Sequence, residues 1–183
     1  MTDTPSSTIM SAQKLAAALD SLAQAISDAH IGADTIYLLG ILSRGRPLAD
    51  RLAERITSLS GTECKVGSLA TTLYRDDIRT GNVAPKIGGD NTHFDFDVNG
   101  NSIVIVDDVL NSGRTIRAAL DEIMDYGRPA RVQLACLIDR GLREVPIQAD
   151  YLGKSIQTKS TDHVRVKLNE LDGEDSVTLN IAE

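Results

Sequence analysis

Aromatic residues, cysteines and histidines are all scarce in this chain of 183 residues. Phe, Trp and Tyr together make up 3% of the sequence and Trp is absent, so the core has to be built from Leu, Ile, Val and Ala. The two cysteines, Cys64 and Cys136, lie in apolar, strand-like runs without a CxxC partner, which indicates buried reduced thiols and not a disulfide or a metal site. The three histidines, His30, His93 and His163, are far apart and offer no paired spacing for zinc.

Basic residues are in the minority, and the formal net charge is -7 at pH 7. This balance argues against a protein that coats nucleic acid nonspecifically, because such binding needs a basic face, although it leaves room for a local basic patch. No segment approaches the roughly 20 consecutive apolar residues of a membrane span. The polar residues 1–10 also lack the basic and then apolar regions of a signal peptide. We therefore expect a cytoplasmic protein without a membrane partner.

Short apolar runs alternate with amphipathic segments along the chain. Apolar residues at helical spacing predict helices over residues 12–29, 47–60 and 116–126. Apolar runs predict buried strands over residues 35–42, 64–74, 103–106, 132–138 and, more briefly, 149–153. This order indicates an α/β fold in which helices flank a mostly parallel, twisted sheet. The length suits a single domain over residues 11–183, after a flexible tail of residues 1–10.

Two segments depart from this alternation. Residues 75–92 are polar and rich in Gly and Pro, and a loop of this length inside a compact domain is typical of a mobile lid, which we place at residues 75–89. Residues 164–168 and 177–181 alternate between apolar and polar side chains around a turn, which predicts a C-terminal β-hairpin.

Residues 103–115 carry the chemistry that the sequence shows most clearly. A β-branched run ends in two carboxylates, Asp107 and Asp108, and is followed by a short Ser-Gly loop and a helix start. Ionised carboxylates accept hydrogen bonds from vicinal hydroxyls, whereas the loop offers backbone N–H groups, hydroxyls and a guanidinium to a phosphate. Ligands of open α/β sheets bind at the carboxyl ends of strands. The stretch therefore predicts a site for a substrate that carries both a phosphate and hydroxyls.

Other interpretations of the acid pair fit less well. An acidic pocket of the receiver-domain type needs its acids after the first strand, and a phosphatase nucleophile motif needs a second acid at position 109, where this chain has Val109. A solvated loop with a helix-capping Ser112 is the plain structural alternative. It does not account for two acids, a hydroxyl, Gly113, Arg114 and Thr115 in register after a buried strand.

This stretch resembles the PRPP-binding motif of type I phosphoribosyltransferases. Over nearly its whole length the chain is similar, more narrowly, to the PyrR family of bifunctional pyrimidine-operon attenuators with uracil phosphoribosyltransferase activity. The segments that carry the resemblance are Gly40-Ile41, Ser43-Arg44-Gly45, Leu52-Ala53-Glu54-Arg55-Ile56, Leu73-Tyr74-Arg75-Asp76-Asp77, Gly127-Arg128-Pro129, Asp139-Arg140-Gly141, Arg143-Glu144, Pro146-Ile147 and Ala149-Asp150-Tyr151-Leu152-Gly153-Lys154.

The resemblance implies that uracil and PRPP give UMP and pyrophosphate, with Mg²⁺ bound through PRPP and not by the protein alone. It assigns catalytic roles to Arg44, Asp107, Asp108 and Arg75. Arg44 would be the cation of a pyrophosphate loop, and the two aspartates would hold the ribose hydroxyls and help to order Mg²⁺. The residues that it assigns to PRPP are Ser43, Gly45, Val109, Leu110, Asn111, Ser112, Gly113, Arg114 and Thr115, of which those at 112–115 would grip the 5′-phosphate. The base would lie near Arg140 and the backbone around Val164, and the lid would exclude water.

The resemblance also implies a homo-oligomer, a dimer or higher, and UMP-dependent binding to the mRNA leader of pyrimidine genes. Basic residues outnumber acidic ones over residues 127–167, and Arg143 and Lys154 are the RNA-binding candidates. Family members that attenuate usually carry His at the position of Leu142 and Arg at that of Gln148, and Thr and His at those of Asp20 and Gln24. An RNA-binding attenuator that uses the pocket as a nucleotide sensor, with little catalysis, is therefore the alternative function. Transfer to a purine base or to orotate is a third possibility.

Overall fold

A computed structural model describes residues 6–71 and 92–181 and contains a main sheet of five parallel strands. The strand order is β3-β2-β4-β5-β6. The bounds are Thr35–Ile41 for β2, Glu63–Leu69 for β3, Ser102–Leu110 for β4, Arg131–Asp139 for β5 and Tyr151–Ser155 for β6. The predicted parallel α/β sheet is confirmed. Several boundaries differ, and the largest changes are that β3 ends at Leu69 and that β4 continues past the acid pair to Leu110.

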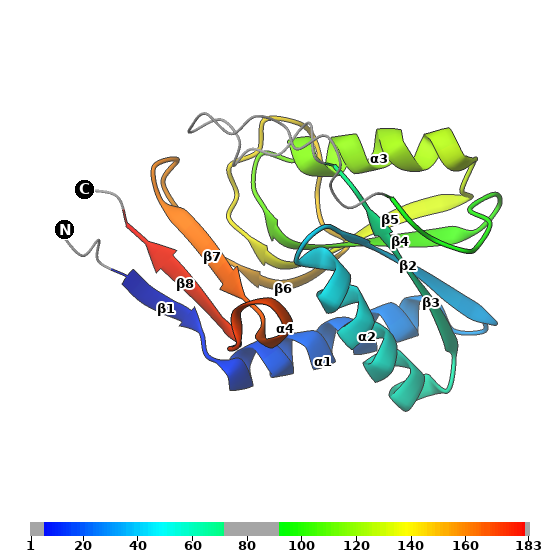
Figure 1. Ribbon diagram of the computed structural model, residues 1–183, viewed down its shortest axis with the longest axis horizontal. Coiled ribbons are helices and arrows are strands. Elements are labelled where there is room, and N and C mark those ends of the chain that lie inside the picture. Colours follow the sequence, from blue (N-terminus) through cyan, green and yellow to red (C-terminus); the bar gives the residue numbers. More distant parts are fainter. Residues whose placement is uncertain (1–5, 72–91, 182–183) are drawn as a thin grey trace.

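Helices cover both faces of the main sheet. Helices α1 (Ala12–Ala29) and α2 (Gly45–Ser60) lie on one face, and α3 (Arg114–Tyr126) lies on the other (Figure 1). Ser11 caps α1 by accepting a hydrogen bond from the backbone N–H of Lys14, as expected for a Ser at a helix start.

The central strand β4 is buried on both sides, which explains its run of β-branched residues. Val104 and Val106 belong to the apolar cluster beneath α1 and α2, whereas Ile103 and Ile105 belong to the cluster beneath α3. Since successive side chains of a strand point to opposite faces, a four-residue apolar run fills two cores.

A second sheet lies beside the main one. Its strands follow the order β1-β8-β7, with β1 at Ser6–Met10, β7 at His163–Lys167 and β8 at Ser176–Asn180. All its pairs are antiparallel, and the short helix α4 (Asn169–Asp172) connects β7 to β8. The assignment of residues 6–10 to a flexible tail is therefore wrong, because they form a strand whose last residue, Met10, is buried in the core. The predicted lid at residues 75–89 lies outside the described residues.

Arg51 links helix α2 to the segment around α4. Its guanidinium donates to Glu170 at 2.6 and 2.7 Å and to Asp175 at 2.8 and 2.9 Å. These hydrogen bonds lower the pKa of both carboxyl groups below their ordinary values. Charge-assisted hydrogen bonds, in addition to apolar contacts, thus hold the second sheet against the helices of the main sheet.

We expect Arg51→Met to lower the free energy of unfolding by about 2 kcal/mol at neutral pH, since it removes hydrogen bonds to charged groups. Both carboxyl groups have a lowered pKa in the folded protein, so their contribution is present above the ordinary carboxyl range. It is lost as the pH falls below about 4.5, through the folded-state pKa values. Urea unfolding of wild type and variant at neutral and acidic pH measures both effects.

The matched control is Arg117→Met, because Arg117 forms an exposed pair with Asp121 on α3. It should cost about 0.5 kcal/mol or less. A difference between wild type and Arg51→Met that stays the same at acidic pH would contradict the electrostatic explanation.

Candidate active site

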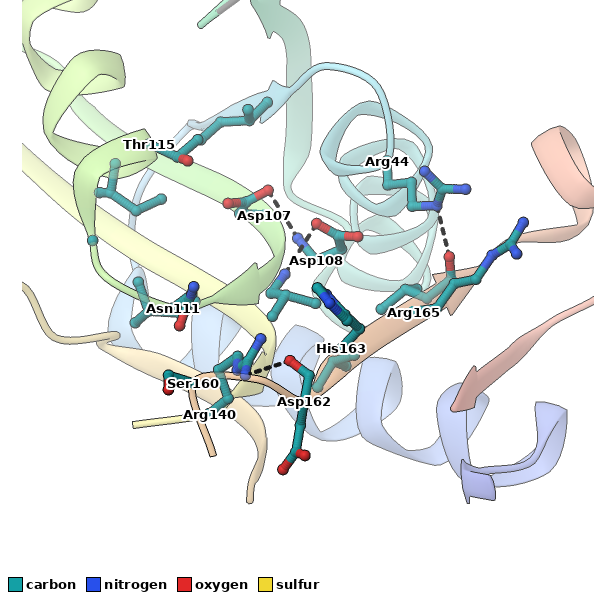
Figure 2. A pocket seen from close by; sticks show the side chains of 17 residues that line it. Arg44, Asp107, Asp108, Asn111, Thr115, Arg140, Ser160, Asp162, His163 and Arg165 are labelled. Carbon is teal, nitrogen blue, oxygen red and sulfur yellow. Dashed lines mark hydrogen bonds between the residues drawn. The ribbon is translucent and has the colours of Figure 1, made fainter. Parts of the chain in front are cut away.

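The loops that follow β2, β4 and β5 reach the same edge of the main sheet, and β7 lies across from them. Together they enclose a cleft of about 440 Å³. Most of the residues that the sequence assigned to a site line this cleft: Arg44, Asp107, Asp108, Val109, Leu110, Asn111, Gly113, Thr115, Arg140 and Val164. Figure 2 shows the two aspartates between Arg44 on one side and Arg140 on the other. The predicted common edge is therefore confirmed.

Other assigned residues do not form the wall of the cleft. They are Ser43, Gly45, Ser112, Arg114, Arg143 and Lys154. Arg75 lies outside the described residues. Gly45 and Ser112 are buried within the loops that shape the cleft, whereas Ser43 and Arg114 are exposed beside it.

The acid pair belongs to strand β4 itself and not to the loop beyond it. Asp107 is buried, with an exposed fraction of 7%, and Asp108 is partly exposed. The carboxylate of Asp107 accepts from the N–H of Asp108, and that of Asp108 accepts from the N–H of Val109, each at 3.0 Å. Both side chains are thereby oriented by the backbone before any ligand binds.

The end of β2 and the start of α2 are packed so closely that glycine is required at one position in each. A Cβ atom at Gly40 would collide with the carbonyl oxygen of Gly45, and one at Gly45 would collide with the carbonyl oxygen of Val106 on β4. This close approach places Arg44 at the edge of the cleft. Its Nε donates to the carbonyl oxygen of Val166 at 2.6 Å, and its Nη2 pairs with Asp172 at 3.1 Å.

The loop after β4 turns sharply into helix α3. Gly113 has φ +89°, and a Cβ atom there would lie 2.8 Å from the side chain of Val145. The N–H groups of Glu144 and Val145 donate to the carbonyl oxygen of Ser112 at 2.9 and 3.2 Å. Ser112 does not cap the helix, since Gly113 occupies that position, and its hydroxyl accepts from the N–H of Arg114 at 3.2 Å.

Arg143 holds the loop after β4 in place through hydrogen bonds. Its guanidinium donates to the carbonyl oxygens of Asn111 and Ile147, each at 2.7 Å, and to the carboxylate of Asp139 at 2.5 Å. The side chain of Asn111 lines the cleft, and its Oδ1 is buried without a donor among residues 6–71 and 92–181. A buried acceptor of this kind is costly unless a ligand or water supplies the missing N–H or O–H.

The wall formed by β7 was only partly anticipated. Val164 was assigned to the base site, but the cleft also contains Ser160, Asp162, His163, Arg165 and Val166. Alternation over residues 164–168 indicated a strand there. It contained no information on where that strand docks, because the docking depends on contacts with segments far away in the sequence.

The cleft combines two carboxylates on one strand with cations from other segments. Such a set can hold the hydroxyls of a sugar and the charge of phosphates at the same time. Within the described part of the chain, no group of three or more His, Cys, Asp or Glu residues is arranged to hold a metal ion. Likewise, no helix in that part is long and apolar enough to cross a membrane.

Known proteins with similar sequences agree with this geometry. Residues 5–171 match the phosphoribosyl transferase domain family. Proteins named "Bifunctional protein PyrR" from Clostridioides difficile, Chloroflexus aurantiacus and Thermus thermophilus are 44%, 48% and 47% identical to this chain. Each alignment covers 93% of this chain and 93–96% of the relative.

The fold also matches solved structures of purine phosphoribosyltransferases. A hypoxanthine-guanine phosphoribosyltransferase from Bacillus anthracis has a TM-score of 0.71 and 18% identity, over 96% of this chain and 98% of that one. A hypoxanthine phosphoribosyltransferase from Trypanosoma cruzi has a TM-score of 0.72 and 14% identity, over 99% and 94%. At this level of identity, the likeness concerns the fold alone.

The sequence relatives are much closer than these structural neighbours, and they cover nearly the full length on both sides. The chain therefore belongs to the phosphoribosyltransferases and, within them, to the PyrR family.

Proposed function

We propose that this chain transfers a phosphoribosyl group from PRPP to uracil, giving UMP and pyrophosphate. One observation carries the proposal: the Asp107–Asp108 pair lies in one cleft with Gly113 and Thr115 of the phosphate loop and with Arg44 from the loop after β2. A substrate with ribose hydroxyls, a 5′-phosphate and a pyrophosphate needs these three kinds of partner. The family membership supports the same reaction.

In this reaction, N1 of uracil bonds to the anomeric carbon of PRPP, the bond from that carbon to a pyrophosphate oxygen breaks, and the N1 proton is released. The anomeric carbon becomes cation-like in the transition state, while negative charge grows on the leaving group. Asp107 and Asp108 hold the ribose through its hydroxyls and place carboxylate charge near the sugar. Arg44 stabilises the pyrophosphate at the edge of the cleft.

The phosphate loop suits the 5′-phosphate. Gly113 is the N-cap of helix α3, and the first N–H groups of a helix, which lack an intrahelical partner, favour an anion. The hydroxyl of Thr115 lies in the cleft. Arg114 pairs with Glu144 at 2.6 Å and is half-exposed, so we assign it to the loop's support and charge rather than to the wall of the site. The Oδ1 of Asn111, which has no donor among residues 6–71 and 92–181, is available to a donor on the substrate.

Mg²⁺ would be held by Asp107, Asp108 and the oxygens of PRPP. Carboxylate oxygens are the ligands that Mg²⁺ prefers, and the ion commonly retains few protein ligands beside substrate phosphates. When bound, it neutralises charge on the pyrophosphate. Arg75 and the lid of residues 75–89, which would exclude water from the site, lie outside the described residues and stay a prediction.

A regulatory role is the second candidate, since the relatives are named as bifunctional proteins. In this role the chain would bind the mRNA leader of pyrimidine genes in response to UMP, as a cytoplasmic homo-oligomer. The guanidinium of Arg143 makes three contacts within the protein, so Lys154 is the better candidate for RNA. Lys154 is exposed on β6, and its ammonium group donates to the carbonyl oxygen of Ile9 at 3.4 Å. Asp20 is also exposed and pairs with Arg55.

We expect Asp107→Asn and Asp108→Asn each to lower kcat/KM for PRPP about 100-fold or more, because the carboxylate charge near the cation-like carbon is lost. Release of pyrophosphate with uracil as acceptor measures the rate. Asp121→Asn, on the exposed side of α3, is the matched control and should match wild type. Wild-type protein that turns over neither uracil nor another pyrimidine would remove the enzymatic function, and competition by hypoxanthine or orotate would identify a different base.

We expect Arg143→Ala to raise the KM for PRPP about tenfold, since a displaced phosphate loop no longer fits its ligand. The cause would be loss of the bond from Arg143 to the carbonyl oxygen of Asn111. Initial rates at varied PRPP measure the change, with Arg117→Ala as the control. If Arg143→Ala had wild-type KM for PRPP, the supporting role of this arginine would be wrong.

For regulation, we expect UMP to increase binding to the leader RNA at low salt, and Lys154→Ala to reduce that binding about fivefold through loss of a phosphate contact. Lys65→Ala on β3, the opposite edge strand of the main sheet, should bind like wild type. Filter binding at several salt concentrations measures both variants. Absence of UMP-dependent binding by wild type would remove the regulatory role.

A further inference from the structure

Arg140, the first residue after β5, is nearly buried although it carries a permanent charge. Its exposed fraction is 7%, and burial lowers its pKa from the ordinary arginine value. The guanidinium donates from Nε to the hydroxyl of Thr158 at 2.9 Å, and from Nη2 to the carbonyl oxygens of Lys159 and Asp162, each at 2.8 Å. Figure 2 shows the bond to Asp162 at the wall of the cleft.

All three acceptors lie in the connection between β6 and β7, at residues 158–162, where the chain forms neither helix nor strand. Two hydrogen bonds within this connection also hold its ends together. The carboxylate of Asp162 accepts from the N–H of Lys159 at 2.7 Å, and the N–H of Asp162 donates to the carbonyl oxygen of Lys159 at 3.2 Å. The resulting loop is thus folded around the guanidinium, with Asp162 itself buried.

This loop leads directly into His163 and Val164, which line the cleft at the start of β7. Arg140 joins this loop to the end of β5. The backbone of His163 and Val164 is held by pairing with β8, and its position relative to the main sheet depends on the bonds of Arg140 as well. A base held by that backbone would respond to any shift of the loop.

We propose that Arg140 is a positioning residue for the base site: its guanidinium fixes the loop of residues 158–162 and, through that loop, the backbone of His163 and Val164 against the bound pyrimidine. The proposal rests on the proposed uracil transfer and deepens it. Arg140 acts through the protein, and the loss of its bonds displaces the groups that contact the base.

The chemistry of arginine suits this role. A planar guanidinium with five N–H donors can serve a hydroxyl and two carbonyl oxygens at once, whereas an ammonium group is a compact point charge. Arg140→Lys should therefore retain part of the loop's order, and Arg140→Gln little of it. Misplacement by about 1 Å is enough to change a reaction rate by about 100-fold.

Thr158 separates positioning from direct contact with the base. It does not line the cleft, yet its hydroxyl accepts the bond from Arg140 Nε. Thr158→Val keeps the shape of the side chain and removes that bond. We expect it to raise the KM for uracil about fivefold and to leave the KM for PRPP unchanged. Arg140→Gln should raise the KM for uracil about 100-fold, with Arg140→Lys between the two.

The double variant Arg140→Gln/Thr158→Val should behave like Arg140→Gln alone, because the bond that Thr158→Val removes is already absent once Arg140 is replaced. Thr161→Val is the matched control: Thr161 is an exposed threonine in the same loop, and its replacement should not change either KM. Thermal denaturation of each variant checks that the fold is retained. Should Arg140→Gln fail to fold, Thr158→Val and Arg140→Lys still test the proposal.

Wild-type KM for uracil in Thr158→Val, together with a raised KM in the arginine variants, would overturn the proposal in favour of direct base contact. A change in the KM for PRPP and not for uracil would also overturn it, since the loop would then serve the phosphoribosyl group. If wild type does not turn over uracil, the transfer reaction itself fails. Calorimetric titration of wild type and Thr158→Val with UMP then provides the same comparison, with about fivefold weaker binding expected for the variant.

Discussion

Parallel pairing of β2, β4 and β5 is the constraint on which the site depends. The register pairs Gly40 with Val106 and Leu110 with Asp139, so the three strands end close together at one edge of the sheet. The loops that follow these strands therefore lie side by side at that edge. Each loop then contributes one kind of group: a cation after β2, the carboxylates and phosphate loop at the end of β4, and a buried arginine after β5.

Close backbone approach makes this meeting possible. The first residue of α2, Gly45, lies against the carbonyl oxygen of Val106, and Gly113 in the loop after β4 lies against the side chain of Val145. A side chain at either glycine would push a loop away from the cleft, since Cβ atoms essentially never approach other atoms so closely. The glycines contribute no chemistry to the reaction. They set the distances between the groups that do.

Among the side chains of residues 6–71 and 92–181, arginines donate most of the long-range hydrogen bonds. Arg44, Arg51, Arg140 and Arg143 each donate to carbonyl oxygens or carboxylates in segments more than 15 residues away, and Arg143 also donates to nearer ones. This use explains why a count of basic residues overstates the surface open to RNA. Arg140 and Arg143 both fall in the basic stretch of residues 127–167, yet their charges are directed into the protein.

The sequence by itself determined the parallel sheet, the strand and helix that frame the acid pair, and the membership in the PyrR family. These properties follow from local periodicity and from contiguous motifs, which are visible without knowledge of contacts. Only the tertiary structure decided that β1 completes a second sheet, that residues 160–166 form a wall of the cleft, and that Arg140 and Arg143 face inward. These outcomes depend on pairs of residues far apart in the chain. A local sequence pattern does not predict which carbonyl oxygen an arginine will bind, because that partner depends on how the two sheets pack.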